Sequence, residues 1–187
     1  MLAAGEGRRL RPLTERWPKP LLPIDGEPVI STLLRKLEEA RLAPVTLVVG
    51  HLGDQIRRFL DGLDVRFAEQ PEPLGSADAV LRAVEGGARS PFIVSAADTV
   101  YSPGDVGRFA REWEESGAAG AMAPPLWGVG PALLPHLQEL PGPPFELLEA
   151  FRRAGSGVKT LELGPLRQLT RPEDVVIHNF VYLESET

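Results

Sequence analysis

The 187-residue chain contains no cysteine and only three histidines, His51, His136 and His178. The absence of cysteine excludes a disulfide framework, a thiolate metal site and a cysteine nucleophile. The histidines are too widely spaced to form a metal-ligand pattern. No segment approaches the ~18 consecutive apolar residues of a membrane span, and no signal-peptide pattern is visible. We therefore expect a cytoplasmic protein without a membrane partner.

Basic residues are in the minority, with 20 Lys and Arg against 26 Asp and Glu and a formal net charge of −6. This acidic balance argues against nucleic acid as a partner. The length and the hydrophobic fraction of 43% predict a single domain, residues 1–187, with enough chain to bury a core. The composition leaves the formation of a homo-oligomer open.

Strand-like and helix-like segments alternate along the chain, which predicts a Rossmann-like α/β fold. We expect an open, mixed but mostly parallel sheet with helices on both faces. The expected strands are 2–4, 45–49, 65–68, 92–95, 120–123 and 158–163, and the expected helices are 28–42, 54–60, 76–84, 105–115, 131–140 and 145–154. Residues 176–183 are expected to be extended. Because ligands of such sheets bind outside the carboxyl ends of the strands, the residues after strands 2–4 and 92–95 are candidates for a binding site.

A glycine-rich, cationic segment directly follows the first expected strand. Gly5 and Gly7 allow backbone N–H groups to turn toward a bound anion. Arg8, Arg9 and Lys19 supply positive charge for a polyphosphate. The segment is not a P-loop, because Gly-x-x-x-x-Gly-Lys-Ser/Thr is absent. It is not a dinucleotide-binding fingerprint either, because leucine stands at position 10 in place of the third glycine.

The complete pattern of residues 2–14 reads Leu-Ala-Ala-Gly-Glu-Gly-Arg-Arg-Leu-Arg-Pro-Leu-Thr, and Pro-Lys-Pro-Leu-Leu-Pro-Ile follows at 18–24. It resembles the signature of the sugar-1-phosphate nucleotidyltransferases, also called nucleotide-sugar pyrophosphorylases. The resemblance implies that an NTP and a sugar 1-phosphate are converted to a nucleotide-sugar and pyrophosphate. It also implies catalytic roles for Arg9 and Lys19. Nucleotide binding is implied for the strand end and loop, residues Leu2, Ala3, Ala4, Gly5 and Gly7.

Two further segments resemble the same family. Residues 70–79 are similar to its Gln-x-x-x-Leu-Gly-Thr-Ala-x-Ala segment, which implies that Gln70, Gly75 and Ser76 bind the nucleoside. A glutamine carboxamide can pair with the O and N–H of uracil or thymine, so UTP or dTTP is the expected nucleotide. Ser76 is also expected to cap the helix that follows it. Asp98, just past the strand 92–95, matches the family's carboxylate for Mg²⁺.

The second half of the chain matches the family less well. Gln168 stands in the place of the second metal-binding Asp, and the family's sugar-binding segments after Asp98 are not found. We therefore divide the domain into a nucleotide-binding half, 1–100, and a shortened acceptor-binding half, 101–187. Two other hypotheses stay open. One is a degenerate nucleotide-binding regulatory subunit, and the other is cytidylyl or other nucleotidyl transfer to a small phospho-alcohol.

Overall fold

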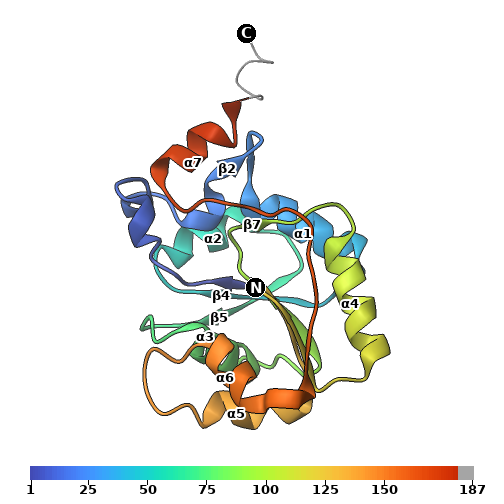
Figure 1. Ribbon diagram of the computed structural model, residues 1–187. Helices are drawn as coiled ribbons and strands as arrows, with labels where there is room; N and C mark the ends of the chain where they lie inside the picture. Colours follow the sequence, from blue (N-terminus) through green and yellow to red (C-terminus); the bar gives the residue numbers. More distant parts are fainter. Residues whose placement is uncertain (181–187) are drawn as a thin grey trace.

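Two sheets, of three and four strands, form the centre of the computed structural model, which describes residues 1–180 (Figure 1). They are joined edge to edge by a parallel bridge between Leu2 and Ala96. Across the joined sheet the strands are β5 (Val65–Glu69), β4 (Val45–Val49), β1 (Leu2–Ala3), β6 (Phe92–Ser95), β9 (Leu126–Val129), β8 (Gly120–Ala123) and β10 (Val158–Thr160). Of these seven strands, only β9 is antiparallel to its neighbours. The sheet is therefore mixed and mostly parallel, as the sequence predicts.

Helices cover both faces of the sheet (Figure 1). One face carries α1 (Val29–Glu39), α2 (Gly53–Phe59) and α4 (Asp105–Ser116), and the other carries α3 (Ser76–Glu85), α5 (Leu134–Gln138) and α6 (Leu147–Ala154). The alternation of side chains along β4 explains the two layers. Leu47 packs with Ile30 of α1 and Ile56 of α2, whereas Val48 packs with Ala79 of α3. Within residues 1–180, no helix is both long and apolar enough to cross a membrane.

Short elements lie near the carboxyl edge of the sheet: β2 (Pro23–Ile24), β3 (Glu27–Pro28), β7 (Thr99–Val100), β11 (Arg167–Gln168), α7 (Pro172–Ile177) and the 3-10 helices η1 (Arg8–Leu10), η2 (Leu13–Glu15) and η3 (Lys19–Leu21). The 3-10 helices η4 (Pro131–Leu133) and η5 (Gly155–Gly157) lie at the opposite edge, because η4 follows the antiparallel strand β9 and η5 precedes β10. Asn179, just after α7, is 6% exposed. Its Nδ2 donates to the carbonyl of Pro23 at 2.9 Å, and its Oδ1 accepts from the N–H of Gly26 at 2.7 Å. Residues distant in sequence thus hold the β2–β3 hairpin in place.

The predicted strands and helices are confirmed to within a few residues, but some elements were not predicted or differ from the prediction. The short strands β2 and β3 were not predicted. Strand β9 was not predicted, because it is buried throughout and shows no polar alternation. The β7–β11 pair was not predicted either, because two residues on each side carry no periodicity. The extended segment expected from residue 176 is wrong for Val176 and Ile177, which belong to α7. Pro172 opens this helix and Asp174 caps its start. Residues 181–183 of that segment lie outside the described part of the chain.

The amino group of Met1 provides a test of this packing. Its nitrogen donates to the carbonyl of Thr46 at 2.8 Å, and burial lowers its pKa from 8.0 to about 5. Between pH 5 and 8 the unfolded chain therefore binds more protons, so the stability present above pH 8 is lost as the pH falls to 5. We expect the free energy of unfolding to fall by up to about 1.4 kcal/mol per pH unit in this range, as measured by urea denaturation. The Nα-acetylated protein should show a flatter profile, and equal slopes would contradict the burial of the amine.

Candidate active site

The glycine-rich loop leaves the carboxyl end of β1 and turns into η1. Gly7, the residue before η1, has a φ of +62°. Residues that carry a side chain rarely adopt this left-handed backbone conformation. A Cβ atom at Gly7 would lie 2.8 Å from Cγ2 of Thr14. The Thr14 hydroxyl donates to the carbonyl of Gly7 at 2.9 Å. Gly7 and Thr14 together therefore fix the shape of the loop.

The loop presents a row of unused backbone donors. Within the described chain, the N–H groups of residues 5–9 donate to no other backbone group, and the first paired one is that of Leu10, to the carbonyl of Gly7 at 2.8 Å. Gly5 is exposed and has open space where a side chain would stand. Successive N–H groups in a turn form a concave site for an anion. The loop is therefore suited to hold phosphate oxygens, as the sequence predicts.

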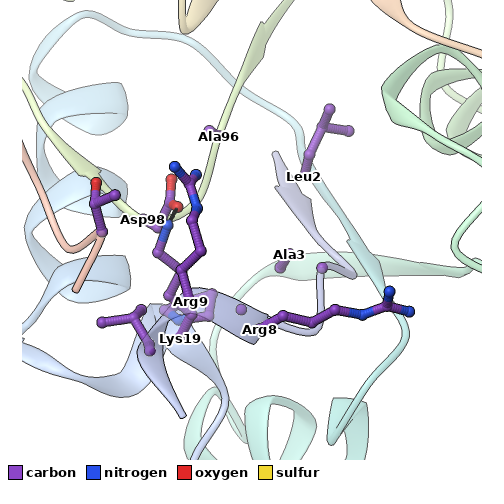
Figure 2. A pocket seen from close by; sticks show the side chains of 12 residues that line it. Leu2, Ala3, Arg8, Arg9, Lys19, Ala96 and Asp98 are labelled. Carbon is purple, nitrogen blue, oxygen red and sulfur yellow. Dashed lines mark ion pairs between the residues drawn. The ribbon is translucent and has the colours of Figure 1, made fainter. Parts of the chain in front are cut away.

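A pocket of about 300 Å³ opens between this loop and the end of β6 (Figure 2). It is lined by Leu2, Ala3, Gly5, Gly7, Arg8, Arg9, Leu10, Lys19, Pro20, Ala96, Asp98 and Thr170. In the view of Figure 2, the side chains of Arg9 and Lys19 extend toward Asp98, whereas Arg8 extends away from it. The structure thus brings together three groups that the sequence placed far apart.

Lys19 and Asp98 form an ion pair between Nζ and Oδ2, and each side chain is 18% exposed. Pro18 and Pro20 flank Lys19 and restrict its backbone. Pro20 is itself buried, so the lysine extends from a fixed segment. For the ammonium group of Lys19 to bind a phosphate, its ion pair with the carboxylate of Asp98 must break.

Glu6 reduces the positive charge at the outer side of the loop. Nε of Arg8 donates to Oε2 of Glu6 at 2.7 Å, and Nη2 of Arg11 lies 3.6 Å from the same oxygen. The hydrogen bond from Arg8 holds the pKa of Glu6 below its ordinary value. Because the cation of Arg8 is engaged in this way, Arg9 and Lys19 are the cations that approach Asp98.

The donor set for a metal ion is small. Asp98 is the one carboxylate among the residues that line the pocket. Gln168 pairs with Thr99 across β11 and β7, and its Nε2 donates to the Thr99 hydroxyl at 2.6 Å. Within residues 1–180, no group of three or more His, Cys, Asp or Glu side chains is arranged to hold a metal. This set fits Mg²⁺ held by one carboxylate with phosphate and water as its other ligands, and does not fit a cage made by the protein alone.

Gln70 lies at the end of β5, outside the pocket lining, and is 6% exposed. Its Nε2 donates to the carbonyl of Gly75 at 3.0 Å and to Oδ2 of Asp78 at 2.8 Å. Asp78 is in turn paired with Arg82 at 3.2 Å. Both amide hydrogens are therefore used within the chain, and Oε1 is the atom left for a ligand.

Gly75 and Ser76 contact the second half of the chain. Gly75 has a φ of +114°, and a Cβ atom there would lie 2.4 Å from the carbonyl oxygen of Phe145. Ser76 does not cap α3 as expected, because its hydroxyl donates to Glu146 at 2.5 Å and accepts the N–H of Leu147 at 2.9 Å. Ser76 thus caps α6, a helix that begins 71 residues further along the chain.

Ala4 connects this region with the pocket. A Cβ atom at Gly50 would lie 3.0 Å from the carbonyl oxygen of Ala4 and 2.9 Å from that of Gln70. The carboxyl ends of β1, β4 and β5 therefore meet at Gly50. The expected nucleoside residues lie along the same edge of the sheet as the pocket, although they do not line it.

Sequence reasoning did not select Thr170 or Pro20, which also line the pocket. The signal for Thr170 lies in the helix that follows, where Oδ2 of Asp174 accepts its N–H at 2.7 Å. The hydrogen bonds that Asp174 accepts from the N–H groups of Arg171 and Thr170 lower the pKa of its carboxyl group. Asp174, which caps the start of α7, therefore fixes the position of Thr170 at the pocket.

Residues 1–161 match the family model of the MobA-like NTP transferase domain. The chain is similar to the bifunctional protein GlmU of Thermus thermophilus, with 36% identity over 76% of this chain and 28% of that protein. GlmU of Xanthomonas axonopodis pv. citri is 37% identical over 57% of this chain and 22% of that protein. The UTP–glucose-1-phosphate uridylyltransferase AglF of Haloferax volcanii is 34% identical over 60% of this chain and 48% of that protein. The matched part spans less than half the length of each of these relatives.

Solved structures share the fold. A structure of apo UDP-glucose pyrophosphorylase superposes with a TM-score of 0.78 and 16% identity, covering 100% of this chain and 98% of that chain. A structure described as a glucose-1-phosphate thymidylyltransferase from Bacillus anthracis gives a TM-score of 0.78 and 16% identity, covering 97% and 93%. The arrangement of strands and helices is therefore that of nucleotidyltransferases.

The contact between Gly75 and Phe145 predicts the effect of one substitution. Gly75→Ala should destabilise the protein by more than the 1–3 kcal/mol of a left-handed backbone alone, because the new Cβ overlaps the Phe145 backbone. Gly62→Ala is the matched control, since Gly62 has a φ of +81° but open space around it. Urea denaturation of both variants measures the difference. Equal losses of stability would show that Phe145 does not press on Gly75.

Proposed function

Because the chain belongs to the MobA-like NTP transferase domain family, we propose that it transfers a nucleotidyl group from an NTP to a sugar 1-phosphate. The products are a nucleotide-sugar and pyrophosphate. The observation that carries the proposal is the pocket at the carboxyl edge of the sheet, where a loop with unused N–H groups and the cations Arg9 and Lys19 stand opposite Asp98. The name of the relative AglF describes the same reaction.

The charges of the pocket suit a triphosphate. The N–H groups of residues 5–9 and the guanidinium group of Arg9 bind the β- and γ-phosphates. Arg9 is exposed, so its guanidinium group lies on the solvent side of the loop. Leu2 and Ala3 form the floor at the end of β1. Lys19 leaves Asp98 and neutralises the reacting phosphates.

The proposed reaction is an in-line displacement at phosphorus. An oxygen of the sugar phosphate forms a bond to the α-phosphorus of the NTP, and the bond from that phosphorus to the bridging oxygen of pyrophosphate breaks. Pyrophosphate leaves with the electron pair. The protein acts by positioning both phosphates and by offering positive charge where negative charge gathers.

Asp98 is the residue that would hold Mg²⁺, since it is the carboxylate of the pocket. When bound, the ion withdraws charge from the phosphate oxygens. Asp98 loses its partner when Lys19 turns to the nucleotide, so its carboxylate becomes free to take a cation at the same moment.

The nucleoside lies along the sheet edge from Ala4 to Gln70, Gly75 and Ser76. Both amide hydrogens of Gln70 are engaged within the chain, so the expected pairing with both O and N–H of a pyrimidine is not available, and Oε1 alone is left to accept the imide N–H of uracil or thymine. UTP or dTTP stays a prediction from the sequence. Ser76 and Gly75 act indirectly, by joining the nucleotide-binding half, 1–100, to the acceptor-binding half, 101–187, within one domain. A cytoplasmic location and a homo-oligomer stay predictions from the sequence.

Pyrophosphate release from a panel of NTPs and sugar 1-phosphates tests the proposal. We expect release with one sugar 1-phosphate and with UTP or dTTP in preference to ATP or GTP. Nucleotide binding without turnover on any acceptor would support the degenerate-subunit hypothesis instead. Turnover with a phospho-alcohol alone would support a different acceptor class.

Lys19→Ala should lower the rate of nucleotide-sugar formation by on the order of 10²-fold, because a charge that stabilises the transition state is removed. Lys159→Ala is the control, since Lys159 is an exposed lysine of β10 on the far edge of the sheet. Thermal denaturation of both variants checks that the fold is kept. Parental turnover in Lys19→Ala would exclude the catalytic role.

Metal binding should depend on the nucleotide. Calorimetry should detect no Mg²⁺ binding to the free protein, but joint binding of Mg²⁺ and NTP. Asp98→Asn should abolish this coupling, and Gln168→Asp should strengthen it, because Gln168 pairs with Thr99, the residue that follows Asp98. Asp64→Asn, at an exposed position before β5, should have no effect. If Asp98→Asn is silent and Gln168→Asp binds no better, neither position faces the phosphates.

A further inference from the structure

Few hydrogen bonds join the glycine-rich loop to the rest of the protein. The backbone hydrogen bonds of residues 5–17 are local, each from a residue to one three or four positions before it. In the described part of the chain, two side chains outside this segment form hydrogen bonds to it. They belong to His51, which lies between β4 and α2, and to Gln55, in the first turn of α2. The long-range polar contacts of the loop therefore come from one place in the fold.

His51 forms a hydrogen bond to the backbone of Thr14. Its Nε2 lies 2.9 Å from the Thr14 carbonyl oxygen. Because a carbonyl oxygen only accepts, Nε2 must carry a hydrogen and is the donor. Gln55 makes a similar contact, in which Nε2 donates to the Arg16 carbonyl at 2.9 Å, but that contact is exposed. The contact of His51 is partly buried, so water competes with it less.

The sheet fixes the position of His51. Its N–H donates to the carbonyl of Ala4 at 3.4 Å, just beyond the pairing of Ala3 with Val49. Leu52, the next residue, has a φ of +54°, a left-handed conformation that turns the chain from the strand into α2. The imidazole ring therefore extends from a fixed point at the carboxyl edge of the sheet to the far side of the glycine-rich loop.

Thr14 transmits the contact of His51 to the glycine turn. Thr14 is 1% exposed. The carbonyl of Gly7 accepts its hydroxyl at 2.9 Å and the N–H of Leu10 at 2.8 Å. This carbonyl and the N–H of Arg8 belong to one planar trans peptide group, so they point in opposite directions. Two hydrogen bonds on the carbonyl therefore fix the direction of the Arg8 N–H, one of the unused donors of the loop.

We propose that His51 is a positioning residue of the phosphate site, which through Thr14 holds the N–H groups of the loop in the arrangement that binds the phosphates. The proposal rests on the proposed function in that the loop receives phosphate oxygens. His51 does not line the pocket, so it acts through Thr14 and not on the phosphates directly. A loop that is arranged before binding loses less conformational freedom when the phosphates bind.

The positive charge that a histidine can carry is a second way for His51 to affect the site. The hydrogen bond from Arg8 is the largest cause of the lowered pKa of Glu6, and the charge of His51 is a smaller one. A protonated ring would therefore also add positive charge beside the loop. A variant that keeps the hydrogen-bond donor but carries no charge separates positioning from this effect.

Binding of inorganic tripolyphosphate, measured by calorimetry, tests the proposal. His51→Phe keeps a ring without a donor and should weaken binding about fivefold, the effect expected for one lost hydrogen bond. His51→Gln keeps an uncharged N–H donor and should bind within about twofold of the parent. His136→Phe is the matched control, since His136 lies on α5 and does not line the pocket, and it should bind as the parent does.

A double variant tests whether His51 acts through Thr14. Thr14→Val removes the hydroxyl at similar size and should weaken binding by a similar factor. His51→Phe combined with Thr14→Val should bind little more weakly than either single variant, because both changes break the same series of contacts. Thermal denaturation checks that each variant is folded. Parental binding by His51→Phe, a Gln variant as weak as the Phe variant, or two losses that multiply would each overturn the proposal.

Turnover separates this inference from the proposed function. With an NTP and a sugar 1-phosphate, His51→Phe should raise the KM for the NTP and leave the KM for the sugar 1-phosphate unchanged. If the parent transfers the nucleotide and His51→Phe has parental KM values, the inference fails and the proposed function stands. If tripolyphosphate binding depends on His51 as expected but no acceptor is ever used, the inference stands and the proposed function fails.

Discussion

Six buried apolar side chains hold the parts of the candidate active site together: Leu10, Leu22, Ile24, Val29, Val100 and Leu169. They come from the glycine loop, the segment after Lys19, the start of α1, strand β7 after Asp98 and the segment after Gln168. Burial of apolar surface is non-directional and strong, so it can join segments that share no sequence proximity. The Lys19–Asp98 pair and the pocket beside it form because this cluster brings their backbones together.

The two halves of the chain, which divide near residue 100, are joined by strand pairing and by backbone hydrogen bonds. Strand β6 of the first half pairs with β9 of the second, and the N–H and carbonyl of Phe145 pair with Leu74 and Ala77 at 2.7 Å. Ser76 completes the contact by capping α6. The second half therefore forms part of the support of the loop between β5 and α3, and a change in α6 alters this loop, which carries the proposed nucleoside residues Gly75 and Ser76.

Features that depend on local sequence could be predicted. The glycine loop and Asp98 follow strands whose apolar character is plain, and the sheet rule then places both at one edge. Contacts across long separations could not be predicted. The local pattern makes Ser76 the cap of α3, but the N–H that it accepts belongs to Leu147. The pairing of both Gln70 amide hydrogens depends on how the loop closes over Asp78, which no spacing reveals.

The contact of Asn179 with the β2–β3 hairpin has a consequence for the order of folding. Its Oδ1 accepts the N–H of Gly26 across 153 residues of sequence, and Arg167 pairs with Asp25 across 142. Contacts of such separation form late, because a large loop must close before they are made. During synthesis the segment that carries Lys19 leaves the ribosome well before Arg167 and Asn179, whose contacts hold the β2–β3 hairpin that follows it. The candidate active site is therefore begun before the residues that complete it are synthesised.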